Sequence, residues 1–198
     1  MPGIIMEIRT LTGQDLLQAI DALAKLRIAV FAEYPYLYEG SAAYEGAYVR
    51  EFVAEPGSVL VAAFDGDRIV GAATASPMAS QKPAFRAPLE ERGIDTGRLF
   101  YFGESVLLPE YRGQGIGHRF FDEREAVVQR AGAAAACFAS VMRPADHPLR
   151  PVGYRPHDAF WTGRGYAPVE GLVTQLAWKD RGEAAESAKP MQFWLKNF

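Results

Sequence analysis

The sequence predicts a single α/β domain, residues 1–198, in which a mixed central β-sheet is flanked by helices. Two apolar runs around the turn Asp65-Gly66-Asp67 are typical of an antiparallel hairpin. A strand, an amphipathic helix and another strand follow one another between residues 99 and 141, which indicates a right-handed crossover between parallel strands. The length of 198 residues is enough to bury one sizeable core.

The elements before residue 99 follow from the local apolar pattern. Thr12 and Asp15 resemble a capping box, and the apolar residues after them recur at helical spacing. Proline and mixed charge interrupt the region after the hairpin and indicate an insertion. The expected elements are strands over 4–11, 58–64 and 68–75, a helix from Thr12 to Phe31, and a loop-rich insertion over 78–98 with a short helix at 86–92.

The elements after residue 99 are organised around a helix that begins at Ile116. Its apolar face is interrupted by Arg124, which we expect either to extend its stem along the core or to pair with a buried acid. Gly132 is the predicted end of this helix, and three prolines make residues 143–155 irregular. The expected elements are strands over 99–108, 133–141, 166–179 and 191–196, and helices over 116–131 and 157–162.

Composition and charge exclude several classes of partner. Apolar residues make up 49% and charged residues 23% of the chain, as in ordinary globular proteins. The net charge of −3 provides no basic field for nucleic acid. No apolar run reaches the roughly 20 residues that span a bilayer, so we expect no membrane partner and a cytoplasmic location. The single cysteine, Cys137, lies in an apolar run and is expected to be buried rather than nucleophilic.

The sequence from Arg112 to His118, Arg-Gly-Gln-Gly-Ile-Gly-His, is the most informative segment. It joins the end of an apolar strand to the start of a helix, where unpaired backbone N–H groups and the helix dipole attract anions. Glycine at alternate positions allows a phosphate to approach the backbone. No Lys-Ser or Lys-Thr pair follows, as a P-loop requires, and the glycine spacing differs from the Rossmann fingerprint.

At these residues the chain resembles the GCN5-related N-acetyltransferase (GNAT) superfamily. Its signature, Gln/Arg-x-x-Gly-x-Gly/Ala, is matched by Arg112, Gly115 and Gly117, and residues 160–169 resemble the late helix-turn-strand segment of that family. The resemblance implies the acyl-CoA N-acyltransferase fold with acetyl-CoA as co-substrate. It also implies that the diphosphate binds at Arg112, Gly113, Gln114, Gly115, Ile116, Gly117 and His118, and that the pantetheine arm pairs with Val106 and Leu107.

The resemblance implies direct transfer of an acetyl group to a primary amine in a ternary complex. Such a transfer needs a base, and Glu104, a carboxylate within an apolar strand, is the candidate. Strand alternation places Tyr101 rather than Glu104 at a typical catalytic position of the family, unless a bulge near Ser105 changes the face. The alternative for Glu104 is a structural pair with a core arginine such as Arg124.

The leaving thiolate needs a proton donor, for which many family members use a tyrosine on the late helix. Trp161 occupies that position here, and an indole N–H is no useful acid. Tyr154, His157 and Tyr166 lie near it in sequence, and Tyr154 is preferred because it precedes the helix in a loop. We predict Tyr154 as the acid.

The segment from Glu33 to Val53 contains five tyrosines. Segments at this position often form the acceptor site in the family, so Tyr36 and Tyr38 are predicted to contact the acceptor, a small cationic or aromatic amine or an amino-acid derivative. The alternative is that these rings pack a second helix onto the sheet.

No metal is expected, because the spacing of His147, His157 and Asp158 lacks a compact ligand pair. The alternative function is a non-catalytic acyl-CoA-binding sensor or regulatory module. The sequence also leaves open whether the chain forms a homodimer.

Overall fold

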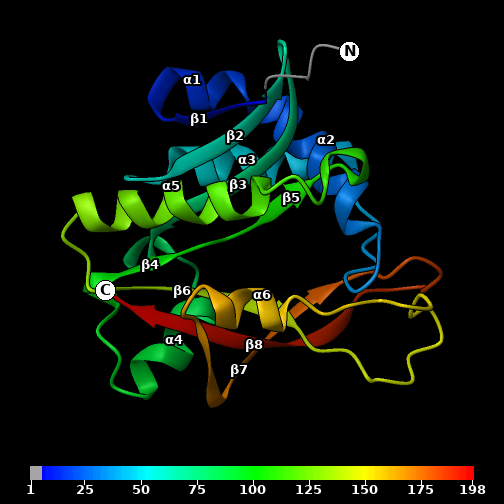
Figure 1. Cartoon of the computed structure of the whole chain (residues 1–198). Helices are drawn as coiled ribbons and strands as arrows, with labels where there is room; N and C mark the ends of the chain where they lie inside the picture. Colours follow the sequence, from blue (N-terminus) through cyan, green and yellow to red (C-terminus); the bar gives the residue numbers. More distant parts are fainter. Residues whose placement is uncertain (1–5) are drawn as a thin grey trace.

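A mixed β-sheet is the centre of the computed structural model, which describes residues 6–198 (Figure 1). The strands follow the order β1-β2-β3-β4-β6-β8-β7, and β5 pairs with β3. The pair β4 and β6 is parallel, whereas the other neighbours are antiparallel. The strands are β1 Glu7–Leu11, β2 Val59–Asp65, β3 Arg68–Pro77, β4 Leu99–Tyr101, β5 Ser105–Leu107, β6 Ala135–Val141, β7 Ala167–Trp178 and β8 Ser187–Asn197.

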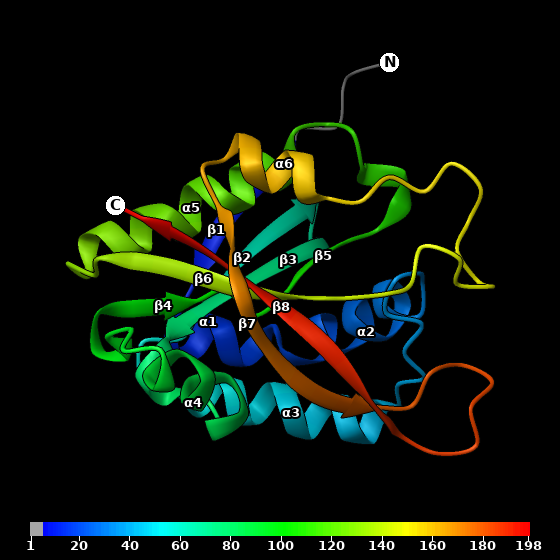
Figure 2. The ribbon, with the colours of Figure 1, turned by 90° about the horizontal axis from the view of Figure 1, so that it is seen from below.

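Helices cover both faces of this sheet. Figure 2 shows α5 and α6 on one side, and α1 to α4 on the other. None of the helices within residues 6–198 is long and apolar enough to cross a membrane. The helices are α1 Gly13–Gln18, α2 Ile20–Phe31, α3 Ala42–Ala54, α4 Pro83–Glu91, α5 Ile116–Arg130 and α6 Asp158–Gly163, with short 3-10 turns η1 Met78–Ser80, η2 Thr96–Arg98 and η3 Pro109–Tyr111. The fold predicted from the sequence is thereby confirmed.

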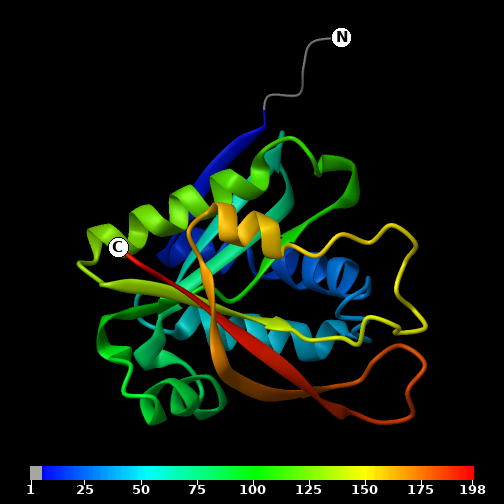
Figure 3. The same cartoon turned by 60° about the horizontal axis from the view of Figure 1, so that its bottom comes forward.

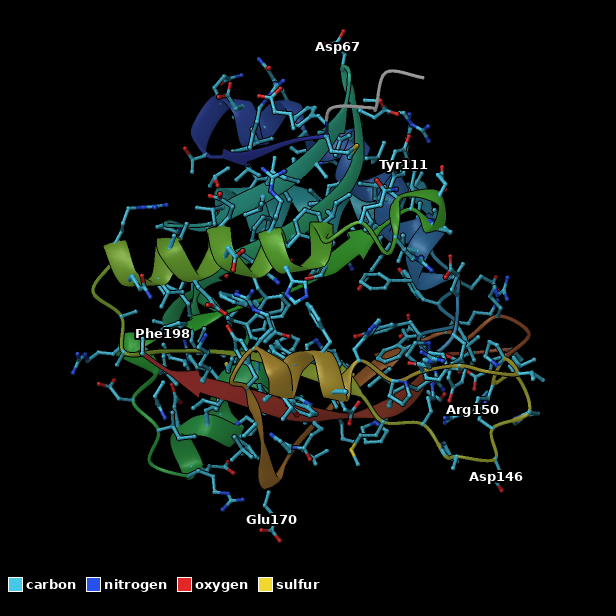
Figure 4. All side chains as sticks on the ribbon, in the orientation of Figure 1. Asp67, Tyr111, Asp146, Arg150, Glu170 and Phe198 are labelled. Atoms are coloured by element: carbon cyan, nitrogen blue, oxygen red, sulfur yellow. The ribbon has the colours of Figure 1, made fainter. Side chains whose placement is uncertain are left out.

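The hairpin of β2 and β3 forms as expected. Gly66 has a φ of +59° in the turn, a conformation that residues with a Cβ rarely adopt. Figure 4 labels Asp67 at the tip of this hairpin. Both strands are buried along most of their length because α2 and α3 cover one face and α5 the other, which explains their nearly continuous apolar sequence.

The expected strand over 99–108 is interrupted, and the interruption changes which face its side chains occupy. In β4, Tyr101 packs among residues on the α4 side of the sheet, whereas Phe102 packs against α5. After the break, Glu104 pairs with Arg27 of α2, and Ser105 contacts Arg124 of α5. The side chains of odd-numbered residues therefore face the α4 side of the sheet before the break and the α5 side after it. A β-bulge causes such a change of face.

The same break separates β5 from β6. The N–H of Phe102 donates to the carbonyl of Cys137 at 2.8 Å, and beyond this bond β5 pairs with β3. Figure 1 shows β5 running away from β6 and β8 toward the start of α5. The sheet is therefore open between β5 and β6, directly beside the glycine-rich turn.

The bounds of three elements differ from those expected. The helix expected from Thr12 to Phe31 is two helices, because the chain forms a tight turn at Ala19. The short helix expected at 86–92 forms as α4 but begins earlier, at Pro83. Pro88 within it lacks the N–H that would bond Ala84, and the hydroxyl of Thr174 donates to the Ala84 carbonyl instead. The final strand begins at Ser187, within the expected loop. The expected first strand partly lies outside the described residues.

Candidate active site

A cavity of about 1430 Å³ opens where β5 and β6 separate. One part is lined by Gly113, Gly115 and Gly117 at the start of α5, and another by Glu104 at the bulge. The loop after α2, the loop after β6 and the β7–β8 connection meet at this end of the molecule (Figure 3). Two segments that the sequence separates by more than 60 residues, the tyrosine-rich loop and the glycine turn, therefore share one cavity.

The start of α5 has the geometry of an anion-binding turn. Gly113 and Gly115 have φ values of +76° and +79°, and an added Cβ at either would meet no atom within 4 Å. The first helical bond runs from the N–H of Arg119 to the carbonyl of Gly115 at 3.3 Å. The N–H groups of Ile116, Gly117 and His118 precede that bond and therefore have no partner within the helix. This cradle fits an extended phosphate group at a helix start.

Arg112 and Gln114 are held by neighbouring protein groups. The guanidinium of Arg112 contacts both carboxylate oxygens of Glu33, at 2.9 and 3.2 Å, and its Nε donates to the carbonyl of Leu107 at 3.1 Å. The Gln114 side chain bends back to the carbonyl of Glu110 at 3.3 Å. Because these two side chains are already engaged, a phosphate at this turn would be bound mainly by backbone N–H groups.

The edge of β5 exposes alternate backbone groups to the opening. The carbonyl of Glu104 accepts a hydrogen bond from the backbone N–H of Thr74 at 2.9 Å, and the N–H of Leu108 donates to the carbonyl of Val70 at 3.0 Å. The backbone N–H and carbonyl groups of the even-numbered residues therefore point toward β3. The backbone of Ser105 and Leu107 must then face the opening. Val106, expected with Leu107 to contact a pantetheine arm, is fully buried and has its backbone turned toward β3.

The bulge brings the Glu104 side chain into the cavity on the α2 side of the sheet. Its side chain is 5% exposed, and its Oε1 lies 3.0 Å from Nη1 of Arg27. The structural alternative, a pair with a core arginine, therefore does form, but the arginine is Arg27 of α2 and not the expected Arg124. Arg124 instead donates to the carbonyls of Phe120, Thr74 and Glu104 at 3.1, 3.3 and 3.4 Å and to Ser105 Oγ at 2.9 Å.

Arg124 thus follows neither of the two expectations made for it. It is 1% exposed, and within residues 6–198 it has no carboxylate partner. Its guanidinium lies 4.3 Å from the ring centre of Phe102 and 4.7 Å from that of Phe121. The carbonyls of Glu104 and Thr74 already accept from backbone N–H groups, of Thr74 and Gly103 respectively, and Arg124 adds a second donor to each at the break in the strand.

Two buried charges beside Glu104 were missed from the sequence. Arg27 of α2 bonds Glu45 of α3 as well as Glu104, and Glu45 has no exposed surface. Burial opposes the charge of Arg27, but the Glu104 and Glu45 carboxylates outweigh it and raise the pKa of Arg27. The available signal was that Arg27 falls on the same helical face as Leu23.

The predicted tyrosines are distributed unevenly. Tyr36 lines the cavity, and its ring lies 4.7 Å from that of Phe31; burial, then the nearby Tyr154, raises the pKa of Tyr36 to about 12. Tyr38 is not among the lining residues. Tyr101 is also outside the lining, under α4 against the ring of Phe85 at 4.8 Å.

Tyr154 lines the cavity from the proline-rich loop after β6. Its ring meets that of Tyr34 edge-on at 4.7 Å, and the Arg150 guanidinium lies 5.2 Å from its ring centre. Figure 4 labels Arg150 on this loop. Burial, then the neighbouring Tyr34, raises the pKa of Tyr154, so its phenol keeps its proton at neutral pH. Trp161 also lines the cavity, and its ring packs on that of Phe138.

Arg143 fixes the loop that carries Tyr36. Its guanidinium pairs with Asp180 at 2.7 Å and donates to the carbonyls of Pro35 and Tyr36 at 2.7 and 2.8 Å. The tyrosine-rich loop is therefore attached to both β6 and the β7–β8 connection.

Other polar groups do not form a metal site in the described part of the chain. No cluster of three or more His, Cys, Asp or Glu side chains suited to a metal ion is found among residues 6–198. Cys137 is fully buried, and burial raises the pKa of its thiol, which makes it a poor nucleophile.

Comparison with known proteins agrees with this geometry. The acetyltransferase (GNAT) family model matches residues 23–152. No curated protein matches the chain in sequence. Among solved structures, an aminoglycoside 6'-N-acetyltransferase complexed with coenzyme A is 18% identical, with a TM-score of 0.61 over 96% of each chain.

Two further structures are similar in fold. PaiA N-acetyltransferase from Thermoplasma acidophilum, in complex with coenzyme A, is 14% identical, with a TM-score of 0.52 over 98% of this chain and 99% of that one. A GCN5-related N-acetyltransferase from Kribbella flavida is 14% identical, with a TM-score of 0.57 over 96% and 98%. Because the family model covers more than half of the chain and the fold agrees along nearly all of it, the protein belongs to the GNAT family of acetyltransferases.

Proposed function

We propose that this acetyltransferase transfers the acetyl group of acetyl-CoA to a primary amine of a small molecule in a direct ternary complex. The observation that carries the proposal is the single cavity that joins the glycine turn of α5 to the Glu104 carboxylate, with the open edge of β5 between them. Two of the structures similar in fold were solved with coenzyme A.

The coenzyme is proposed to lie along the open edge of β5, with its diphosphate at the start of α5 and its thioester at the bulge. The cradle formed by Gly113, Gly115 and the first N–H groups of α5 would hold the diphosphate. The backbone of Ser105 and Leu107 would bind the pantetheine arm. Acetyl-CoA supplies the acetyl group as a thioester, which this arrangement directs toward the bulge.

Glu104 is proposed as the base. It accepts a proton from the acceptor ammonium, directly or through one water, and the neutral nitrogen then forms a bond to the acetyl carbon. The carbon–sulfur bond breaks, the electron pair stays on sulfur, and the nitrogen loses its second proton to water, which leaves a neutral amide. Tyr154 donates its proton to that thiolate, which its raised pKa permits, because the phenol is protonated when the reaction begins. Tyr101 has no part in this proposal, because it does not line the cavity.

The acceptor is proposed to lie between the loop after α2 and the loop after β6. Tyr36 and Tyr154 line this part of the cavity, and Arg143 keeps the loop of Tyr36 in place. Aromatic rings with a carboxylate at the inner end suit a small cationic or aromatic amine or an amino-acid derivative. Tyr38 would support the loop from outside the cavity.

The test is thiol release from acetyl-CoA with a panel of aliphatic amines, aromatic amines and amino acids. Release should depend on the amine, and Glu104→Gln should lower kcat/KM by about 10²–10⁴ without weakening coenzyme binding in calorimetry. Coenzyme binding with no amine-dependent release would favour a non-catalytic binding module instead. Full activity of Glu104→Gln would remove Glu104 from the mechanism.

A further inference from the structure

One buried arginine is shared by two carboxylates at the inner end of the cavity. Arg27 on α2 bonds Glu45 through Nε and Glu104 through Nη1, at 3.0 Å to the latter. The three side chains are 11%, 0% and 5% exposed for Arg27, Glu45 and Glu104. The cluster holds two negative charges and one positive charge, so it has an excess of one negative charge when both acids are ionised.

Glu45 is the unexplained member of this cluster. It lies on the buried face of α3, and its Oε1 has no hydrogen-bond partner within the described residues. A buried carboxylate with an unsatisfied oxygen is expensive to retain for stability alone. Its ion pair is with the same guanidinium that holds the proposed base, and the Tyr38 hydroxyl also faces it: burial, then Glu45, raises the pKa of Tyr38.

The other groups that face Glu104 do not compete with it for Arg27. Tyr48 of α3, Tyr36 of the loop after α2 and Tyr101 of β4 are phenols, and the pKa of each is raised, chiefly by burial. On the opposite face Arg124 of α5 approaches the Glu104 backbone, where it contacts the carbonyl oxygen. Glu45 is therefore the acidic side chain that competes with Glu104 for Arg27.

We propose that Glu45 is a positioning residue that keeps Arg27 divided between two carboxylates, so that Glu104 remains basic enough to take a proton from the acceptor. With the Nε edge of its planar guanidinium occupied by Glu45, Arg27 cannot form a fork-shaped contact with Glu104 through that edge. The negative charge of Glu45 also favours the protonated form of Glu104. This inference rests on the proposed role of Glu104 as the base.

The direct test needs no acceptor. Carbon-detected NMR of the full chain labelled at glutamate, with the Glu104 signal assigned from Glu104→Gln, gives its titration midpoint. Glu45→Gln should lower that midpoint by about one pH unit, because a like charge is lost and Arg27 turns fully to Glu104. The control is Glu51→Gln on the same helix, which is exposed and pairs with Lys82, and it should leave the midpoint unchanged. An unchanged or raised midpoint in Glu45→Gln would overturn the proposal.

A second pair of variants covers failure of Glu45→Gln to fold. Arg27→Gln removes the shared cation and should raise the Glu104 midpoint, and the double variant R27Q/E45Q should bring it down again. A double variant with the midpoint of Arg27→Gln would show that Glu45 does not act on Glu104. In thiol release with an amine accepted in the panel, the acid limb of kcat/KM should shift with the NMR midpoint. If the midpoint shifts as expected while Glu104→Gln stays active, the coupling holds and the base assignment fails.

Discussion

The Arg112 guanidinium lies against the Glu33 carboxylate, with Nη1 2.9 Å from Oε2, so the arginine of the glycine turn is tied to the end of α2. Both side chains are almost half exposed, which limits the strength of the pair to about 1 kcal/mol. The contact nevertheless places a negative charge beside the proposed diphosphate site. It links the glycine turn to the loop that carries Tyr36.

Removal of that negative charge should strengthen coenzyme binding. Glu33→Gln frees Arg112 to approach a phosphate, so the Kd for acetyl-CoA should fall by up to about fivefold at low salt and by less at high salt. Calorimetry measures both. The control is Glu39→Gln, which also breaks an exposed ion pair, with Lys179, but neither of these residues lines the cavity. Weaker binding by Glu33→Gln would show that the pair instead preorganises the turn.

The glycine cradle should be sensitive at Gly115. An alanine at φ +79° is strained by about 1–2 kcal/mol, and its Cβ would occupy the open space of the anion site. Gly115→Ala should therefore raise the Kd for acetyl-CoA about tenfold or more. Gly132→Ala is the matched control, because Gly132 has a φ of +66° at the other end of α5 and the same open space. Equal effects on Kd would argue against the cradle.

Tyr154→Phe should slow turnover and leave coenzyme affinity unchanged. The phenol is protonated below its raised pKa, so the wild-type rate should fall on the alkaline side as Tyr154 ionises, and the variant should lack that alkaline limb. Thiol release measured against pH, with calorimetry of acetyl-CoA, tests both parts. An unaltered rate and profile would assign proton donation to another group.

Arg124 should be important for stability because its buried guanidinium joins α5 to the carbonyls and the Ser105 hydroxyl at the bulge. Arg124→Met leaves the Thr74 and Glu104 carbonyls and the Ser105 hydroxyl without this donor, and should lower the free energy of unfolding by about 2–4 kcal/mol. Urea unfolding measures the change. Arg130→Met, at an exposed position near the end of α5, should change it by less than about 0.5 kcal/mol. Similar losses in both variants would contradict the role given to Arg124.

Tyr36 should make stability depend on alkaline pH. Its pKa is raised to about 12 by burial, and then by Tyr154, whereas an unfolded tyrosine titrates near about 10. Between these values the folded protein keeps a proton that the unfolded chain loses, so the free energy of unfolding falls as pH rises. Tyr36→Phe keeps the ring without the hydroxyl and should show a shallower fall in the free energy of unfolding by urea between about pH 10 and 12. Identical slopes would mean that Tyr36 titrates normally.

The sequence by itself determined the hairpin, the crossover and the anion turn. These features depend on neighbours in the chain: Gly66 at a hairpin turn, an apolar stripe along α5, and glycines at a helix start. It also raised the condition under which Glu104 would reach the active-site face, a bulge near Ser105. Whether that bulge forms depends on a competition between β3 and β6 for one strand, which local sequence does not encode.

Tertiary structure decided the partners of the buried charges and the course of α4. Arg27, Glu45 and Glu104 lie on three elements, and their contact follows from how α2 and α3 pack against the bulge. Pro88 inside α4 cannot donate to the Ala84 carbonyl, and the hydroxyl of Thr174, 86 residues further along the chain, donates to it instead. Each of these depends on satisfying a buried charge or a carbonyl with a donor distant in sequence, because burial removes the water that would otherwise do so.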